Sequence, residues 1–321
     1  MPRSADSTAS RRYPIRPARL AGARAARARV VFLREGPSRV RAVQTYIEHA
    51  PDRRLRLGVG VWREMARELR ENAELIQRLC LRDLAARYRQ SLLGVAWGFV
   101  LPLALMLVFV ALRRASVLPI AETGPPYAVW VYAGILVWQL FSRAVTLASQ
   151  SIVNNLSILS QVPAPGEVFV LAAVGQAVCE FLMGLPALAV LCAWHGLVPH
   201  WAILWTPALL LALLAAATGI GLLLGLVNAA LRDVGAALPL IMLAWMLATP
   251  VIYPPSADWP WRLLAALNPV APLLCNARSL ALEGQWLLLN ELLAAVLLSL
   301  TLLLASWRLF HILEPRIAER L

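Results

Sequence analysis

The residue types that carry chemistry in enzymes are either missing from this chain or too dispersed to act together. All 30 residues counted as lysine or arginine are arginine. A P-loop needs a lysine on the phosphates of ATP and a Schiff base needs a lysine amine, so this polypeptide cannot be a Walker-type ATPase by itself. Its four cysteines contain no CxxC pair, and its four histidines show no ligand spacing. We therefore expect buried free thiols rather than a disulfide framework or a metal site.

One carboxyl group, that of Glu180, falls deep inside a long apolar stretch. A charged group at the centre of a bilayer costs roughly 2.5–3.5 kcal/mol on insertion scales, so this side chain must face protein or water, or be protonated. Two roles stay open for it: a structural hydrogen bond to a neighbouring helix, and a part in gating or assembly. A membrane-embedded glycosyltransferase would need carboxylates or arginines clustered at one membrane face, and the sequence shows no such constellation.

The composition is that of a protein that crosses a membrane several times. Hydrophobic residues make up 60% of the chain, and the mean hydropathy is +0.66. Residues 1–90 hold 21 basic and 9 acidic residues, a net 21 − 9 = +12, while residues 91–321 hold 9 of each. We expect residues 1–60 to form an Arg-rich, disordered cytoplasmic extension. An arm for nucleic acid would explain its charge, but contact with anionic lipid fits a membrane protein better, so we expect no nucleic-acid partner.

The spacing of apolar residues predicts an all-α polytopic membrane protein. Residues 61–90 carry apolar residues at three- or four-residue steps with Arg and Glu between them, which predicts an amphipathic interface helix. From Ser91 to Leu112 no residue is charged over 22 positions, enough to cross a hydrocarbon core of about 30 Å. We predict a transmembrane domain over 91–309 with six transmembrane helices, at about 91–112, 127–147, 168–193, 203–228, 234–252 and 287–307.

The connections between these spans predict the orientation of the chain. Basic residues favour the cytoplasmic side, so the N-terminus and, after six crossings, the tail at 310–321 are both expected there. The inner loop 149–165 is polar and contains a short helical stretch. The outer segment 253–286 is half apolar but too short to span, which predicts short re-entrant or outer-leaflet helices between spans five and six, or a cap lying flat outside. Most of the twelve tryptophans fit an interfacial belt, although stacking on sugar rings stays open for some.

Three groups of residues, taken in order, resemble a known family. The first lies at the entry to the first span and comprises Arg82, Asp83, Arg87, Tyr88, Ser91, Leu92, Leu93, Gly94, Trp97 and Pro102. The second follows the second span and comprises Ser151, Asn155, Ile158, Pro165 and Glu167. The third brackets the fifth span and comprises Arg232, Asp233, Pro250, Val251, Ile252, Tyr253, Asn268, Pro269 and Arg278. Over about 75–315 the chain resembles the permease subunit of bacterial type-2 ABC exporters of polysaccharide, such as O-antigen, capsule or teichoic-acid chains. It departs from that pattern at Gln161, Ala164 and Val170.

This resemblance implies a transport subunit that is not itself an enzyme. Two copies would form a homodimer in the bacterial cytoplasmic (inner) membrane, and two separate ABC ATPase subunits would bind ATP and Mg, so this chain would bind no cofactor. The cargo would be a lipid-linked polysaccharide; the alternative is a type-2 ABC permease that exports a drug or lipid. The resemblance assigns ATPase coupling to Ser151, Asn155, Ile158, Pro165 and Glu167. It assigns functional roles to four residues of the interface helix, Arg82, Asp83, Arg87 and Tyr88. It does the same for two residues of an inner loop, Arg232 and Asp233. Candidates for a glycan path or gate are Glu180, Tyr253, Trp259, Trp261, Asn268 and Arg278.

Overall fold

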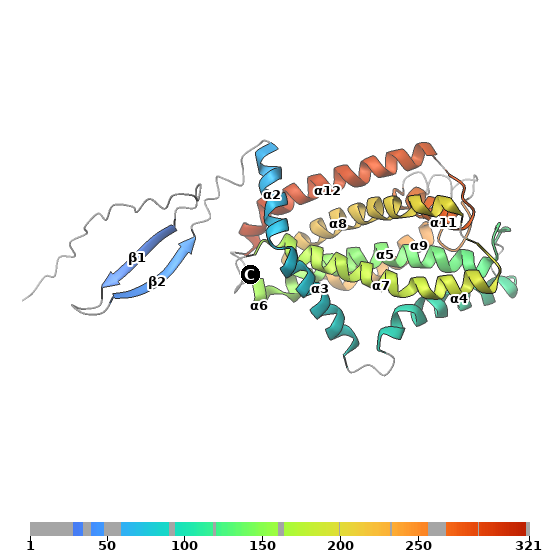
Figure 1. Cartoon of the computed structure of the whole chain (residues 1–321), viewed down its shortest axis with the longest axis horizontal. Helices are drawn as coiled ribbons and strands as arrows, with labels where there is room; N and C mark the ends of the chain where they lie inside the picture. The colour runs from blue at the N-terminus through green and yellow to red at the C-terminus, as the bar shows by residue number, and fades with distance from the viewer. Residues whose placement is uncertain are drawn as a thin grey trace, which may run out of the picture. The chain divides into compact units, whose positions relative to one another are not determined.

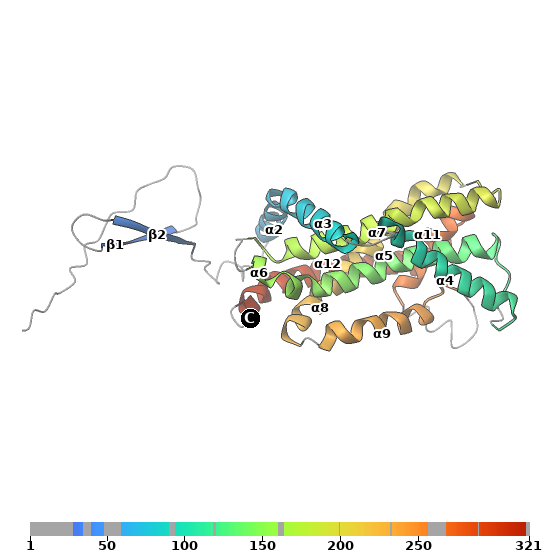
Figure 2. The same ribbon diagram turned by 90° about the horizontal axis from the view of Figure 1, so that it is seen from below.

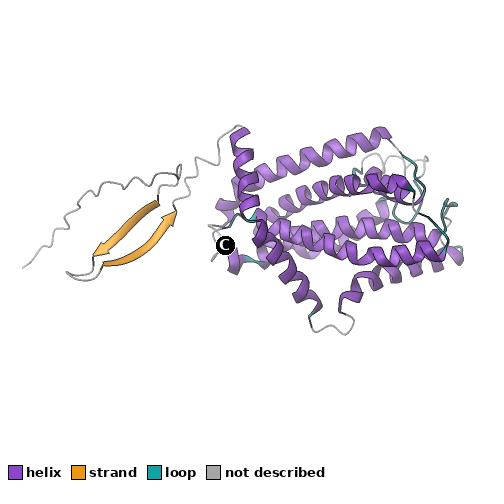
Figure 3. Cartoon of the chain, in the orientation of Figure 1, coloured by secondary structure: helices purple, strands orange, loops and turns teal. Residues whose placement is uncertain are grey.

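The computed structural model describes residues 28–34, 40–47, 59–89, 94–117, 120–159, 164–198, 200–231, 233–255, 268–287 and 289–318. It divides into two units, Met1–Arg56 and Leu57–Leu321. In the first unit, β1 (Ala28–Arg34) and β2 (Val40–Ile47) pair as antiparallel strands, drawn in orange in Figure 3. This hairpin lies inside 1–60, where we expected disorder. Short runs of β-branched and aromatic residues favour strands locally, although the segment as a whole is rich in Arg, Ala and Pro.

In the second unit, the described residues form helices, turns and connections. The helices are α2 (Val59–Glu71), α3 (Ala73–Tyr88), η1 (Gly94–Ala96), α4 (Trp97–Arg114), α5 (Tyr127–Asn154), α6 (Leu156–Leu159), α7 (Glu167–Trp194), η2 (Trp201–Trp205), α8 (Thr206–Ala230), α9 (Asp233–Ala248), α11 (Val270–Leu282) and α12 (Leu289–Ala318). Figure 1 shows α6 and the C-terminal end of α12 at one end of this bundle, and α11 at the other. We call these the α6 end and the α11 end.

Among the described residues, five helical segments are long and apolar enough to cross a membrane: α4, α5, α7, η2 with α8, and α12. They match five of the six predicted spans, and a helical, polytopic membrane domain is thereby confirmed. The remaining predicted span, 234–252, corresponds to α9, which has 16 residues. At 1.5 Å per residue such a helix is about 24 Å long, somewhat less than a hydrocarbon core of about 30 Å.

The central helix of the bundle is α5. It packs against α7 and α8, and α8 packs in turn against α12, as Figures 1 and 2 show. In the most apolar window of α5, 78% of the residues are buried, against 17% for α4 and 22% for α12. Gly221 of α8 lies so close to Ala148 of α5 that a β-carbon would collide with it. Small residues allow this close approach, which is how helices associate in lipid without a hydrophobic driving force.

The interface segment predicted as one helix over 61–90 is divided into two helices, α2 and α3. The division falls at Asn72, whose Nδ2 donates to the carbonyl of Glu68 at 2.8 Å. Asparagine side chains compete in this way with the helical backbone and favour helix ends. Trp62 of α2 meets Trp307 of α12 edge to face, with 5.9 Å between ring centroids. By contrast, α3 packs against α7.

The outer segment predicted at 253–286 contains the buried helix α11. Every residue from Val270 to Leu280 is buried, and α11 contacts α5, α8 and α12. The backbone at Gly134 of α5 makes room for α11, since a β-carbon there would lie 2.9 Å from Nη1 of Arg278 and 2.7 Å from the Val251 carbonyl oxygen. A cap lying flat on the surface would leave one face of the helix exposed, so this burial favours a helix inserted into the bundle.

Candidate functional site

Two features bring together the residues that the sequence singled out. The first is a junction at the α6 end, where α3, α6, the start of α7 and the last turns of α12 meet. The second is a cavity between α3, α4, α5, α7 and α9, which we call the polar cavity because an ion pair lies in its otherwise largely apolar wall. We describe the junction first, because it contains most of the residues assigned to ATPase coupling.

At the junction, Asn155 connects α5 to the interface helix α3. Its Nδ2 donates to the carbonyl of Ser151 at 2.9 Å, and its Oδ1 accepts from Nη2 of Arg82 at 2.7 Å. Arg82 also forms an ion pair with Asp83, with Nη2 and Oδ1 2.6 Å apart. Hydrogen bonds that involve a charged group are the stronger kind, about 1.5–3 kcal/mol each. The Arg82 guanidinium therefore joins α3 to the segment that leads into α6.

An apolar cluster supports this polar contact. Leu79 and Cys80 of α3 pack against Val168 and Phe169 at the start of α7, and Ile158 of α6 packs against the same cluster. Burial raises the pKa of the Cys80 thiol to about 11, with Cys179 as a further cause. These contacts make α3, α6 and the first turn of α7 one packed body.

The other end of the 149–165 loop is bound to α12. The backbone N–H of Gly166 donates to Oε1 of Glu314 at 2.6 Å. Next to it, Oε1 of Glu167 lies 3.0 Å from Nδ1 of His311, and both side chains are buried. Glu167, which the resemblance assigned to ATPase coupling, therefore faces α12.

The side chains assigned to coupling differ in their exposure. Ser151 and Asn155 are buried, as is Glu167, while Ile158 and Pro165 are half-buried. Asn154 and Ser157, which the sequence did not single out, are exposed on either side of Asn155. A docking partner would therefore meet Asn154 and Ser157 first, and the buried residues would shape the loop from behind.

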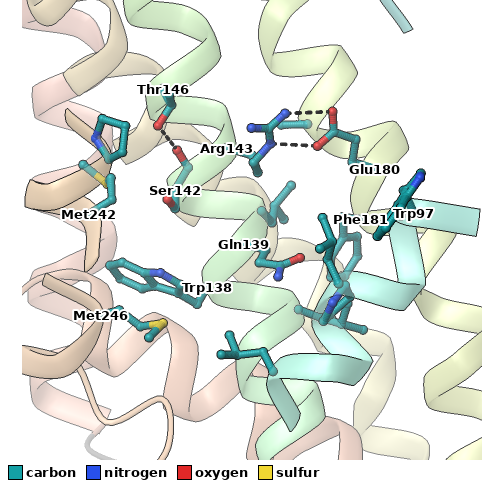
Figure 4. Close-up of a pocket in the computed structure, with 18 of the residues that line it drawn as sticks. Trp97, Trp138, Gln139, Ser142, Arg143, Thr146, Glu180, Phe181, Met242 and Met246 are labelled. Atoms are coloured by element: carbon teal, nitrogen blue, oxygen red, sulfur yellow. Dashed lines mark hydrogen bonds and ion pairs between the residues drawn. The ribbon is translucent and has the colours of Figure 1, made fainter. Parts of the chain in front are cut away.

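In the polar cavity, Glu180 lies between Arg87 and Arg143, and Figure 4 shows its contacts with Arg143. Arg143 of α5 donates to it with Nε and Nη2, at 2.8 and 3.2 Å. Nη1 of Arg87, from α3, lies 3.1 Å from Oε1, and Nε2 of Gln176 donates to the same oxygen at 3.2 Å. The Glu180 side chain is 12% exposed. The structure therefore surrounds the Glu180 carboxyl with protein and places arginines from two other helices beside it.

The cavity has a volume of about 420 Å³ and walls of mixed character. Arg143 and Glu180 form one side, with the hydroxyls of Ser142 and Thr146 and the amide of Gln139 nearby, while Trp97 and Trp138 add aromatic faces. Such walls offer hydrogen-bonding groups and flat apolar faces together. That combination suits a polyhydroxylated ring, which has polar edges and apolar C–H faces.

Three residues predicted for a glycan path lie outside the lining of this cavity and form hydrogen bonds with neighbouring parts of the bundle. Arg278 is buried, donates to the carbonyl of Val251 at 3.0 Å, and stacks 3.4 Å from the ring centroid of Trp130. Asn268 accepts from Trp245 at 3.1 Å and donates to Thr249 at 2.7 Å.

Tyr253, the third, donates to the carbonyl of Leu247 at 2.9 Å. None of the three lines the cavity, and their part in a path stays a prediction. Trp259, Trp261 and Arg232 lie outside the described residues, and Asp233 is the first residue of α9.

Sequence reasoning did not identify Arg143 as the partner of Glu180. Both are ionisable residues of opposite sign in predicted spans, and such residues usually pair with one another. That signal could have predicted the pair. Burial and the neighbouring carboxylate raise the pKa of Tyr88, which also lines the cavity.

Comparisons with known proteins identify the family of this chain. The family model described as "ABC-2 type transporter" matches residues 74–281, more than half of the chain. An O-antigen export system permease protein of Myxococcus xanthus is 29% identical over 258 residues, covering 79% of this chain and 98% of that relative. A protein of the same description from Klebsiella pneumoniae is 24% identical over 209 residues, covering 63% of this chain and 78% of the relative. The chain therefore belongs to the ABC-2 type transporter family.

Proposed function

We propose that this chain is the permease subunit of an ATP-driven exporter that moves a lipid-linked, O-antigen-like polysaccharide across the bacterial inner membrane. The observation that carries the proposal is the similarity to the Myxococcus xanthus permease, which extends over 98% of that protein. The mixed walls of the polar cavity support the same class of cargo, because they combine hydroxyl, amide and aromatic groups.

In this proposal the α6 end faces the cytoplasm and both termini lie there. The excess of arginine before the first span supports this orientation. The sixth crossing is α9, with the connection at 249–255 completing its path. The buried helix α11 then lies at the depth of the outer leaflet, enclosed by α5, α8 and α12.

The driving force comes from two separate ABC ATPase subunits, which bind ATP and Mg. They dock on α6 and α3, and two copies of this chain form the translocation path between them. The absence of lysine supports this division of labour, since a P-loop could not be completed within this chain.

The contacts at the junction suggest how movement reaches the cavity. A push on α6 acts on α3 through the Arg82–Asn155 hydrogen bond and on α7 through the apolar cluster. From α3 and α7 it reaches α5, because Arg87, Glu180 and Arg143 join these three helices at the cavity wall. Nucleotide-driven closure of the ATPases can thus change the width of the cavity.

Deletion and complementation of the gene test the cargo. We expect surface polysaccharide to disappear in the deletion strain and lipid-linked chains to accumulate on the cytoplasmic side, with both defects reversed by the wild-type gene. Unchanged surface polysaccharide together with altered drug resistance would refute the polysaccharide assignment and favour a drug or lipid exporter of the same architecture.

A further inference from the structure

We propose that the α11 end carries a binding site for a phosphate or diphosphate group, formed by Arg113 and Arg114 of α4 with His195. The ring of Tyr127 forms one wall, while its hydroxyl donates to the carbonyl of Ile252 at 2.9 Å. These residues line a hollow of about 360 Å³, within the range of about 300–1,000 Å³ typical of small-ligand sites. Tyr127 begins α5, whose 28 residues separate it by about 42 Å from the junction at the α6 end. The hollow also shares no lining residue with the polar cavity, so the site is distinct from both features described above.

The two arginines are not needed to finish the helix that bears them. The chain turns at Ser116, which adopts a φ of 54° in the left-handed region. The N–H of Ser116 donates to the carbonyl of Arg113 at 3.0 Å, and that of Val117 to the carbonyl of Leu112 at 3.1 Å. This is the Schellman arrangement, in which backbone groups satisfy the last carbonyls of a helix. The guanidinium groups thus remain available for other partners.

No ion pair joins these arginines to an acidic residue in the part of the chain that the structure describes. Arg113 stacks over the ring of Tyr127, with 4.5 Å to the centroid, and its other contact is a long one of 3.5 Å to the Ala121 carbonyl. Arg114 is exposed and forms no hydrogen bond or ion pair with any residue that the structure describes. None of the described residues that line the hollow is acidic. At the polar cavity, in contrast, Glu180 forms ion pairs with both Arg87 and Arg143.

The position and chemistry of this charge identify the class of ligand. Two guanidinium groups at the end of a membrane-spanning helix match the planar, multidentate geometry of phosphate oxygens. His195 binds the Leu191 carbonyl through Nδ1 at 2.9 Å, and in its protonated form Nε2 would add a donor.

Two sources could supply such a group: the headgroup of an anionic phospholipid, or a diphosphate such as one that links a glycan to its lipid carrier. The second source depends on the proposed function, whereas the site itself does not. Binding can be measured without ATP or transport, so a failure of this proposal is distinguishable from a failure of the export proposal.

The test uses the full chain in nanodiscs of neutral phosphatidylcholine, titrated with inorganic pyrophosphate by calorimetry. We expect Arg114→Ala to weaken pyrophosphate binding about tenfold or more, because one charge-assisted contact is lost. Arg114→Lys, which keeps the charge without the forked geometry, should give an intermediate affinity. Arg114 is exposed, so its replacement should leave folding intact. The matched control is Arg78→Ala, an exposed arginine on α3, which should bind like the wild type.

A second arm uses nanodiscs that contain phosphatidylglycerol, and counts the phosphatidylglycerol molecules that remain on the extracted protein by native mass spectrometry. Weaker pyrophosphate binding with unchanged lipid retention supports a diphosphate ligand. Loss of retained phosphatidylglycerol in Arg114→Ala, but not in Arg78→Ala, supports a phospholipid headgroup. If Arg114→Ala changes neither quantity, the proposed phosphate site is overturned.

Discussion

Replacing Glu180 with glutamine removes the carboxylate that joins three helices at the cavity wall. Arg87 of α3 and Arg143 of α5 would then keep their charges without this partner. Removing one member of a fully buried ion pair costs about 3–5 kcal/mol. The side chains of Arg87 and Arg143 are 39% and 29% exposed, so water screens part of the repulsion. We therefore expect Glu180→Gln to lower the free energy of unfolding by about 1–3 kcal/mol.

The assay is thermal unfolding of the purified chain in nanodiscs, run as a double-mutant cycle. Glu180→Gln and Arg143→Gln should each destabilise, and the double variant should lose less than the sum, with a coupling of about 1–2 kcal/mol. The control is Glu74→Gln, which removes the carboxylate of an exposed ion pair with Arg78 and should change little. Export by Glu180→Gln should also fall, because α3 loses its contact with α7 at the cavity.

The reasoning would be refuted by a Glu180→Gln variant that unfolds at the wild-type temperature, exports normally and shows additive effects with Arg143→Gln. In that case the cluster would be a set of solvated charges, and the movement of α3 would have to reach the cavity by another route.

The remaining predictions concern the junction, one thiol and one glycine. Arg82→Ala should leave ATP hydrolysis by the companion subunits in place while export per ATP falls, because Asn155 loses its bond to α3; Arg82→Lys should restore part of the ratio, and an unchanged ratio would contradict the coupling path. Glu314→Ala should likewise lower export and the thermal stability, by about 1–2 kcal/mol, since the Gly166 N–H loses its acceptor; equal stability would show that the contact is dispensable. The Cys80 pKa rises from 9.0 to about 11, so the thiolate form at pH 8 should be about 100-fold less populated than in an ordinary cysteine. Alkylation of Cys80, followed by mass spectrometry, should therefore be correspondingly slow. Fast alkylation would show that α3 separates from α7. Gly134→Ala should destabilise the chain by about 1–3 kcal/mol, because a β-carbon there meets the Val251 carbonyl and Nη1 of Arg278; an unchanged unfolding temperature would mean that α11 shifts at little cost.

The sequence was most successful at predicting the long apolar helices. Long uncharged runs are a strong signal, and five spans fell where hydropathy placed them. The division of the interface segment at Asn72 was not predicted, because an amphipathic pattern persists through a single turn of broken helix. The burial of α11 was only one of two alternatives, since apolar residues in a short segment suit either a re-entrant helix or a surface cap.

The candidate site was harder to predict, because its contacts join residues far apart in the chain. Arg82 and Asn155 were both singled out, but their hydrogen bond spans 73 residues and no local pattern encodes it. Glu167 was assigned to ATPase coupling, and the sequence did not predict that its side chain would be buried against His311. An isolated motif shows which residue types are present; which way they face depends on helices elsewhere in the sequence.

Site-directed crosslinking at Ser157 tests most directly whether a separate ATPase binds this chain from the cytoplasmic side. Ser157 is exposed on α6, so a cysteine there should react with a short bifunctional reagent in intact membranes. We predict a covalent adduct with the ABC ATPase subunit that is lost when the ATPase is not expressed. Failure to form this adduct, with Ser157→Cys instead labelled by an impermeant reagent added from the periplasm, would contradict the proposed orientation and the coupling mechanism together.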